Sequence, residues 1–169
     1  MEDAADKIEI FLQPGDVYFG EADTRIRTLL GSCVSVTAWH PRLRIGAMCH
    51  YMLGSRRSGR SERLDGRYAD EAVLWFLREA SARGTDPMEY EFKIFGGGDM
   101  FGSGAGGRPG VGEANVQHGL AMLERLGHRV VARHLGGSGH RTVIFDVGSG
   151  EVWMRHVPLA RTLQKAKAA

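Results

Sequence analysis

The sequence predicts an α+β fold in which two main helices cover one face of a layered, mixed β-sheet. Seven segments have the two-residue alternation or the β-branched and aromatic content of strands, whereas only two segments have helical spacing of apolar residues. The strands also come in runs, three before the first helix and three after the second. Such grouping is typical of α+β folds rather than of folds in which strands and helices alternate.

The first three strands are expected before residue 54. Residues 7–12 form the first, and Pro14 ends it. Residues 34–39 are rich in β-forming side chains, and residues 45–53 follow after a connection at 41–44. Because this connection is short, the last two strands are expected to pair as a hairpin.

The two helices are expected over residues 68–83 and 113–126, with a strand at 89–95 between them. In the first helix, Gly84 provides the stop, and the apolar side chains recur every three or four residues. These side chains are Ala69, Val73, Phe76, Leu77 and Ala80. Three more strands are expected at 129–135, 141–147 and 151–157, the last two joined by a turn at Gly148-Ser149-Gly150.

The size of the chain indicates one domain. With 169 residues, of which 43% are hydrophobic, it can bury one core of ordinary size. We expect a single domain over residues 1–169, with its motif-bearing core at about 7–157 and a basic tail at 158–169 that frays.

The charge and the N-terminal sequence limit the classes of partner. A formal net charge of +2, from 22 basic and 20 acidic side chains, gives no strong field that would attract nucleic acid or an anionic membrane. Met1 is followed by Glu2, Asp3 and Asp6, unlike a signal peptide, and no apolar run approaches the roughly 20 residues of a membrane span. We therefore expect a cytoplasmic protein with no membrane insertion.

One segment keeps a nucleic-acid-binding alternative open. Residues 54–67 contain five arginines, but no aromatic side chain lies between them, and Glu62 and Asp65 dilute the charge. An exposed loop, which could act as a lid or steer an acidic receptor surface, is favoured over nucleic-acid binding. The arginines are Arg56, Arg57, Arg60, Arg63 and Arg67.

The sequence gives no indication of a cofactor or a metal. The glycine-rich run GGGDMFGSGAGGRPG lacks the GxxxxGK[ST] pattern of a phosphate-binding loop and contains no lysine. The histidines have neither HxxxH nor HExxH spacing, and no cysteines form a CxxC pair. We predict no cofactor and no metal, and we expect this loop to contact a partner through Met100 and Phe101 or to be a simple surface connection.

Cys33 is the candidate nucleophile. It follows Gly31 and Ser32, whose small size suits a sharp turn before a strand, and the backbone amides of such a turn could stabilise a negative charge. His50 lies on the strand expected to pair with that of Cys33, and imidazole is the usual base for a thiol. The alternatives are a Cys33 that packs as a small hydrophobic residue and a His50 that is structural.

Strand geometry separates the two cysteines. Within 45–53, His50 shares a face with Met48 and Met52, whereas Cys49 faces the other side with Tyr51. Cys49 is therefore expected to pack in the core, and Cys33 remains as the thiol that His50 can activate.

Several segments together resemble successive motifs of a known family. They are Thr28–Val34 (TLLGSCV), Gly46–Leu53 (GAMCHYML), Tyr68–Asp70 (YAD), Lys93–Gly97 (KIFGG) with Met100 and Phe101, Gly112 with Asn115 and Val116, and Gly136-Gly137 with Arg141–Val143 and Gly148–Gly150. In this order, and with this interval between Cys33 and His50, the chain resembles the CheD family as far as about Val157.

The resemblance implies a fold and a site similar to the glutamine-deamidating domain of cytotoxic necrotizing factor toxins, with Cys33 as nucleophile and His50 as base. The third family residue is a threonine six positions before the cysteine, where this sequence has Arg27. Thr28 is the nearby candidate to orient His50, and its alternative role is that of an ordinary strand threonine. Asn115, near the start of the second helix, either supports the site or makes only local hydrogen bonds.

The resemblance also implies a substrate and partners. Members of the family convert glutamines on the cytoplasmic helices of methyl-accepting chemotaxis receptors to glutamate, and in some bacteria they bind the phosphatase CheC. A non-catalytic adaptor that only binds these partners is the alternative, and Arg27 is the reason to consider it. We expect a monomer.

Overall fold

A computed structural model describes residues 6–57, 59, 62–102 and 110–160. Within these ranges the elements are β1 (Ile8–Leu12), β2 (Val17–Gly20), β3 (Thr24–Leu30), β4 (Val34–His40), β5 (Ile45–Cys49), α1 (Ala69–Ala82), a 3-10 turn at Pro87–Glu89, β6 (Glu91–Gly96), α2 (Val111–Arg125), β7 (Val130–Leu135), β8 (His140–Asp146) and β9 (Val152–Val157). Residues 103–109 of the glycine-rich run and 161–169 of the expected basic tail lie outside the described part, as does Arg60.

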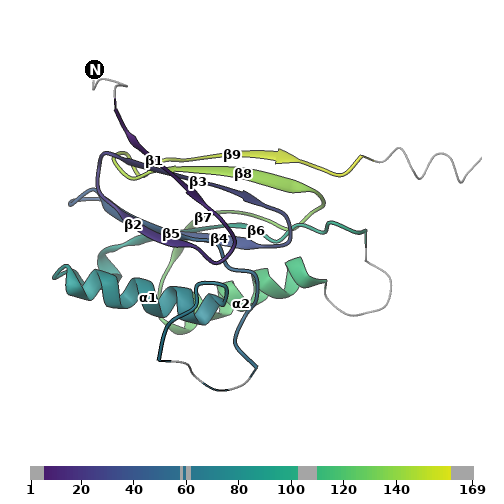
Figure 1. The fold of residues 1–169 in the computed structure, drawn as a ribbon, viewed down its shortest axis with the longest axis horizontal. Coiled ribbons are helices and arrows are strands. Elements are labelled where there is room, and N and C mark those ends of the chain that lie inside the picture. The colour runs from purple at the N-terminus through teal and green to yellow at the C-terminus, as the bar shows by residue number, and fades with distance from the viewer. Residues whose placement is uncertain (1–5, 58, 60–61, 103–109, 161–169) are drawn as a thin grey trace, which may run out of the picture.

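The elements form three layers (Figure 1). Strands β2-β5-β4-β6-β7 make a five-stranded sheet, and strands β1-β3-β8-β9 make a four-stranded sheet that lies over one of its faces. Helices α1 and α2 lie along the other face of the five-stranded sheet. Both sheets are mixed, because β1 pairs with β3 and β6 with β7 in parallel, while the other pairs are antiparallel.

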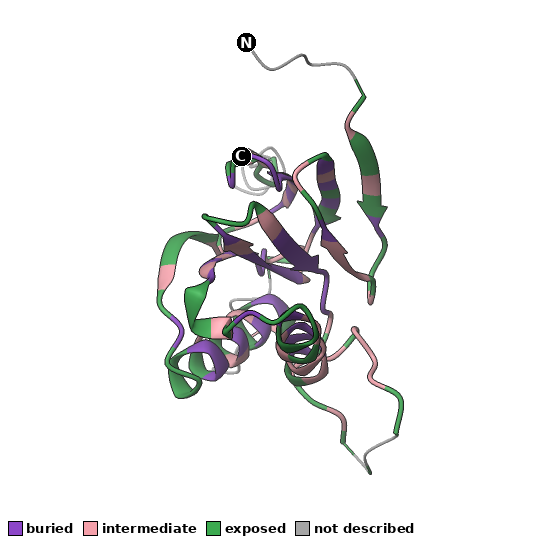
Figure 2. Ribbon diagram, turned by 90° about the vertical axis from the view of Figure 1, so that its left-hand side faces the viewer, coloured by how far each residue is buried: buried purple, intermediate pink, exposed green. Residues whose placement is uncertain are grey.

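Two separate apolar cores hold the layers together, and Figure 2 shows the buried positions concentrated in the strands and on the inner sides of the helices. One core lies between the helices and the five-stranded sheet and includes Val36, Cys49 and Phe76. The other includes Ile26, Met48 and Phe145 and lies between the two sheets. Neighbouring residues of one strand, such as Met48 and Cys49, thus enter different cores, as the two-residue period requires.

The structure confirms the α+β class and both helices, and it corrects the arrangement of the strands. The single mixed sheet that we expected is two sheets, so the face opposite the helices is covered by protein. Five strands precede α1 instead of three, because β2 and β3 were missed. The strand expected at 45–53 ends at Cys49.

The missed strand β3 shows why the sequence pattern was hard to read. Its inward residues are Thr24, Ile26, Thr28 and Leu30, all buried, and its outward residues are Arg25, Arg27 and Leu29. Two threonines on the buried face and a leucine on the exposed face obscure the usual alternation of apolar and polar side chains. This strand places Thr28 in the layer between the sheets.

Two arginines of the segment 54–67 form ion pairs, one with helix α1 and one within the segment. Arg56 donates to Glu71 of α1 at 2.9 Å, and Arg67 donates to Asp65 at 2.6 Å. Two of the arginines considered for nucleic-acid binding therefore already face a carboxylate. In the described ranges, neither helix is long and apolar enough to cross a membrane.

Candidate functional site

Cys33 lies at the end of the turn between β3 and β4, half-buried at the edge of the core between the sheets. The next residue, Val34, forms an isolated antiparallel bridge with Tyr51, with backbone N–H···O distances of 3.1 and 2.9 Å. This bridge fixes the relative position of the residues on either side of it. In the register of this bridge Cys33 and His50 are diagonal neighbours, so their side chains belong to the same face.

His50 follows β5 directly, and its backbone forms hydrogen bonds with the turn between β1 and β2. Its N–H donates to the Asp16 carbonyl at 3.1 Å, and its carbonyl accepts from the Gly15 N–H at 2.8 Å. The imidazole is 2% exposed and faces the four-stranded sheet, on the same side as Met48. Both backbone polar groups of residue 50 therefore pair with the β1–β2 turn and not with β4.

Thr28 fixes the tautomer of His50. Its hydroxyl lies 2.7 Å from His50 Nδ1 and donates to the Leu12 carbonyl at 2.9 Å. Because the single hydroxyl proton is used in the bond to Leu12, Thr28 accepts from His50, and Nδ1 carries the ring proton. The lone pair of the neutral imidazole is then on Nε2, which is the atom a general base needs.

His50 Nε2 is free to act. It is one of three buried side-chain atoms in the described residues that have no hydrogen-bond partner, and Ser35 Oγ is another. The pairings of Val34 with Tyr51 and of Thr37 with Met48 place Ser35 directly opposite His50. Two unsatisfied buried polar atoms on opposing residues are unusual in a protein core, and such atoms occur at sites where a substrate or water completes the hydrogen bonding.

Burial keeps both groups of the pair neutral. It raises the pKa of the Cys33 thiol and lowers the pKa of His50 to about 4, although the Asp16 carboxylate opposes the second shift. At neutral pH the resting site therefore contains a thiol and an imidazole rather than a thiolate and an imidazolium.

The turn that contains Cys33 is fixed by hydrogen bonds that its three carbonyl groups accept from neighbouring segments. The Gly98 N–H donates to the Gly31 carbonyl at 2.9 Å, and the Gly97 N–H donates to the Cys33 carbonyl at 2.9 Å. The carbonyl between them, that of Ser32, accepts from Asn115 Nδ2 at 3.1 Å. In the described part of the chain, by contrast, the N–H groups of Ser32 and Cys33 donate no hydrogen bond, which leaves them able to bind a developing negative charge.

Only glycine fits at two positions behind this turn. Gly96 has φ +115° and a Cβ there would lie 2.3 Å from the Cys33 carbonyl. Gly97 has φ +70° and a Cβ there would lie 2.2 Å from the Val116 side chain. The close approach of β6 to the turn and to α2 therefore depends on these two glycines.

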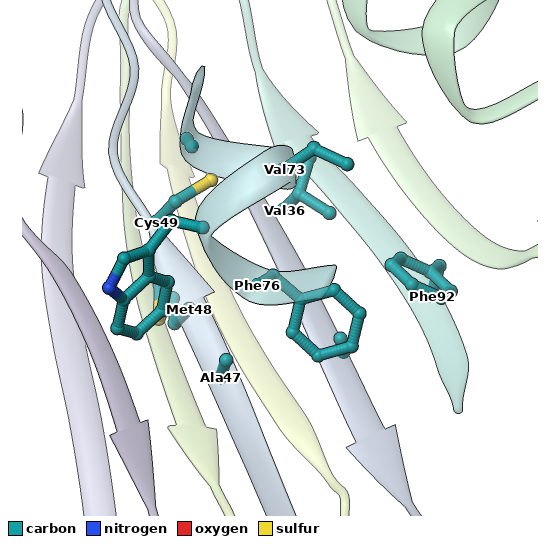
Figure 3. Close-up of a pocket in the computed structure, with 10 residues that line it drawn as sticks. Val36, Ala47, Met48, Cys49, Val73, Phe76 and Phe92 are labelled. Atoms are coloured by element: carbon teal, nitrogen blue, oxygen red, sulfur yellow. The ribbon is translucent and has the colours of Figure 1, made fainter. Parts of the chain in front are cut away.

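Cys49 belongs to a different part of the molecule, as expected. It is 7% exposed and lines a small apolar cavity of about 20 Å³ between α1 and the five-stranded sheet, close to Val36, Val73 and Phe76 (Figure 3). Burial raises its pKa to about 11. It therefore lies on the opposite face of the sheet from His50.

Of the three residues selected from the sequence, Thr28 contacts His50 directly, and Cys33 lies diagonally from His50 across the Val34–Tyr51 bridge. Arg27, at the position where the family pattern has threonine, is exposed on the outer face of the four-stranded sheet. Sequence reasoning missed Ser35 and the glycine amides that hold the turn. Asn115, which it left undecided, contacts the turn directly.

Comparison with known proteins identifies the family of the chain. Residues 52–156, more than half of the chain, match the family model described as CheD chemotactic sensory transduction. The chain is 49% identical over 146 residues to the probable chemoreceptor glutamine deamidase CheD 3 of Dechloromonas aromatica, covering 86% of each protein.

Two further relatives match over nearly the whole chain. The probable chemoreceptor glutamine deamidase CheD of Pseudomonas savastanoi pv. phaseolicola is 48% identical over 161 residues, covering 94% of this chain and 90% of the relative. The corresponding protein of Pseudomonas syringae pv. tomato is 46% identical and covers 95% of this chain and 96% of the relative. Matches of this length include the segment from Thr28 to His50. The chain belongs to the CheD family.

Proposed function

We propose that this protein deamidates glutamine side chains of chemoreceptors in the cytoplasm, with Cys33 as nucleophile, His50 as general base and acid, and Thr28 as the residue that orients His50. The relatives bear the name of this activity. The observation that carries the proposal is the 2.7 Å contact between Thr28 and His50, which directs a free Nε2 to the face of the sheet where Cys33 lies.

The first half of the reaction releases ammonia. Cys33 Sγ attacks the carboxamide carbon of the glutamine, and its proton passes to His50 Nε2. The new S–C bond places a negative charge on the amide oxygen, near the free N–H groups of the turn. The C–N bond then breaks, His50 returns the proton to the departing nitrogen, and a thioester remains on Cys33.

The second half consumes one water molecule. His50, neutral again, takes a proton from the water as it attacks the thioester carbon, and returns this proton to Cys33 Sγ as the S–C bond breaks. The products are a glutamate side chain and the regenerated Cys33 thiol. The lowered pKa of His50 suits this cycle, because the imidazole is unprotonated and ready to accept a proton at the start of each half.

The adaptor alternative has lost its main support. It depended on Arg27 in place of the family threonine, but Thr28 is the residue that contacts His50, and Arg27 points away from the site. Binding of the phosphatase CheC and a monomeric state stay predictions.

The proposal is tested with a cytoplasmic receptor fragment. Incubation with the wild-type protein is expected to release ammonia and to raise the mass of the fragment by about one dalton per modified glutamine. The matched control is the same fragment with those glutamines replaced by glutamate, which should gain no mass. No ammonia from any cognate receptor would contradict the proposed activity.

Replacing Thr28 with valine should slow deamidation by roughly 10- to 100-fold. Valine has the same shape but cannot accept from His50, and a hydrogen bond to a group that becomes charged is worth about 1.5–3 kcal/mol. Thr28→Ser should restore most of the rate. The measurement is ammonia release at neutral pH, with Arg27→Ala as the matched control.

Arg27→Ala should keep a rate within about twofold of the wild type, because the arginine is exposed on the opposite face of the same strand. A large loss in Arg27→Ala together with a small one in Thr28→Val would show that position 27 carries the family role.

A further inference from the structure

Asn115 in α2 makes contacts that its place in the helix does not require. It is buried, with 3% exposed, and its side-chain nitrogen donates to the Ser32 carbonyl at 3.1 Å and to the Met52 carbonyl at 2.8 Å. Its backbone carbonyl accepts from the Tyr51 hydroxyl at 2.6 Å. One side chain thus joins the turn before Cys33 to the segment after His50.

The bond to Ser32 sets the direction of the amide of Cys33. The Ser32 carbonyl and the Cys33 N–H belong to one peptide unit, and the described chain contains no cis peptide bond. In a planar trans unit the N–H points away from the carbonyl. Because Asn115 holds the carbonyl toward α2, the N–H of Cys33 points away from α2.

Among the hydrogen bonds to the three carbonyls of this turn, the one from Asn115 is the only one donated by a side chain in the described residues. The carbonyls of Gly31 and Cys33 accept from backbone N–H groups, which every residue except proline provides, whereas the Ser32 carbonyl depends on the side chain of Asn115. An asparagine suits the position because its NH₂ group offers two donors, and both are used. One of these donors binds the peptide unit that also contains the N–H of the proposed nucleophile.

We propose that Asn115 is a positioning residue, which holds the Ser32–Cys33 peptide so that the Cys33 N–H can stabilise the negative oxygen of the tetrahedral intermediate. The inference rests on the proposed function, because it assumes that Cys33 attacks an acyl carbon. It goes beyond that function by assigning a role to a residue that touches neither the substrate nor the reacting thiol.

The expected effect is specific to acyl chemistry. Loss of one donor to such an oxygen costs about 10²–10³ in kcat in a well-studied protease. In Asn115→Ala, the peptide keeps its place in the chain but loses the bond that orients it, so we expect kcat for receptor deamidation to fall about 100-fold and KM to change by less than about threefold.

Two small reagents separate this role from a general loss of structure. Acylation of Cys33 by p-nitrophenyl acetate passes through a tetrahedral oxyanion, whereas alkylation by iodoacetamide does not. Asn115→Ala is expected to slow the first reaction about 100-fold and to leave the second within about twofold, with modification assigned to Cys33 by mass spectrometry. Asn115→Ser is the second variant, for use if alanine prevents folding.

Tyr51→Phe is the matched control. It removes the hydrogen bond from the Tyr51 hydroxyl to the Asn115 carbonyl but leaves the bond from the Asn115 side chain to the Ser32 carbonyl. The ratio of the acylation rate to the alkylation rate should therefore equal that of the wild type. Equal losses in both reactions of the Asn115 variants, or an unchanged rate with the ester, would overturn the proposal. The same loss in Tyr51→Phe would also overturn it.

The reagents also distinguish this proposal from the deamidase proposal. If the wild type fails to deamidate any receptor but shows the expected dependence of ester acylation on Asn115, the proposed function fails and the positioning role stands. If deamidation proceeds and the ratio does not depend on Asn115, the positioning role alone fails.

Discussion

Replacing Cys33 with alanine is expected to reduce receptor deamidation by at least about 10⁴-fold, because removal of a nucleophile that acts together with its base abolishes covalent catalysis. Cys49→Ala should stay within about twofold of the wild-type rate. Cys49 lies in the core between α1 and the five-stranded sheet, on the far side of that sheet from His50. The measurement is ammonia release from the receptor fragment.

The pair of variants is informative because the chain contains only these two thiols. Cys49→Ala is the harder test of folding, since it removes a buried side chain and should cost about 1 kcal/mol of stability. Thermal unfolding should accompany both assays. Activity that survives Cys33→Ala, or that disappears in a folded Cys49→Ala protein, would contradict the assignment of the nucleophile.

The parts of the fold that the sequence predicts are those set by local patterns. Helix α1 was found within one residue at each end, because its apolar residues keep helical spacing and Gly84 follows it. The opposite orientations of Cys49 and His50 followed from the alternation within one strand. Both features depend on residues close together in the chain.

The parts that the sequence did not predict depend on contacts between distant segments. The division into two sheets arises because β3 pairs with β8, more than a hundred residues away, and not with its neighbours β2 and β4. No local pattern indicates such a partner. The same limit applies to Asn115, whose partners Ser32 and Met52 lie 83 and 63 residues away.

Which of residues 27 and 28 can contact His50 depends on which residues of β3 face inward. Counting back from Cys33 favours position 27, but the buried face of the strand contains residues 26, 28 and 30. A side chain at 27 points to solvent whatever its chemistry, so only Thr28 can reach His50 from this strand. The geometry of the strand thus favours Thr28 over position 27 for the role that the proposed mechanism gives it.

Acidification from pH 6.5 to pH 4 is expected to destabilise the protein by about 3 kcal/mol through His50 alone. Burial lowers the pKa of His50 from its ordinary 6.5 to about 4, so in this range the unfolded chain binds a proton that the folded protein does not. Stability is therefore unaffected above pH 6.5, falls as the pH decreases, and levels off below pH 4, where both states are protonated. The measurement is denaturant unfolding at several pH values.

His50→Gln isolates this contribution, because glutamine cannot be protonated but can still donate to Thr28. Carboxylates and the other histidines titrate in both proteins, so the difference in unfolding free energy between wild type and variant is the quantity to follow. That difference should be constant above pH 6.5 and change in favour of the variant by about 3 kcal/mol down to pH 4. A difference that does not change with pH would mean that His50 is solvated in the folded protein, and the neutral resting pair of thiol and imidazole on which the proposed mechanism depends would then be wrong.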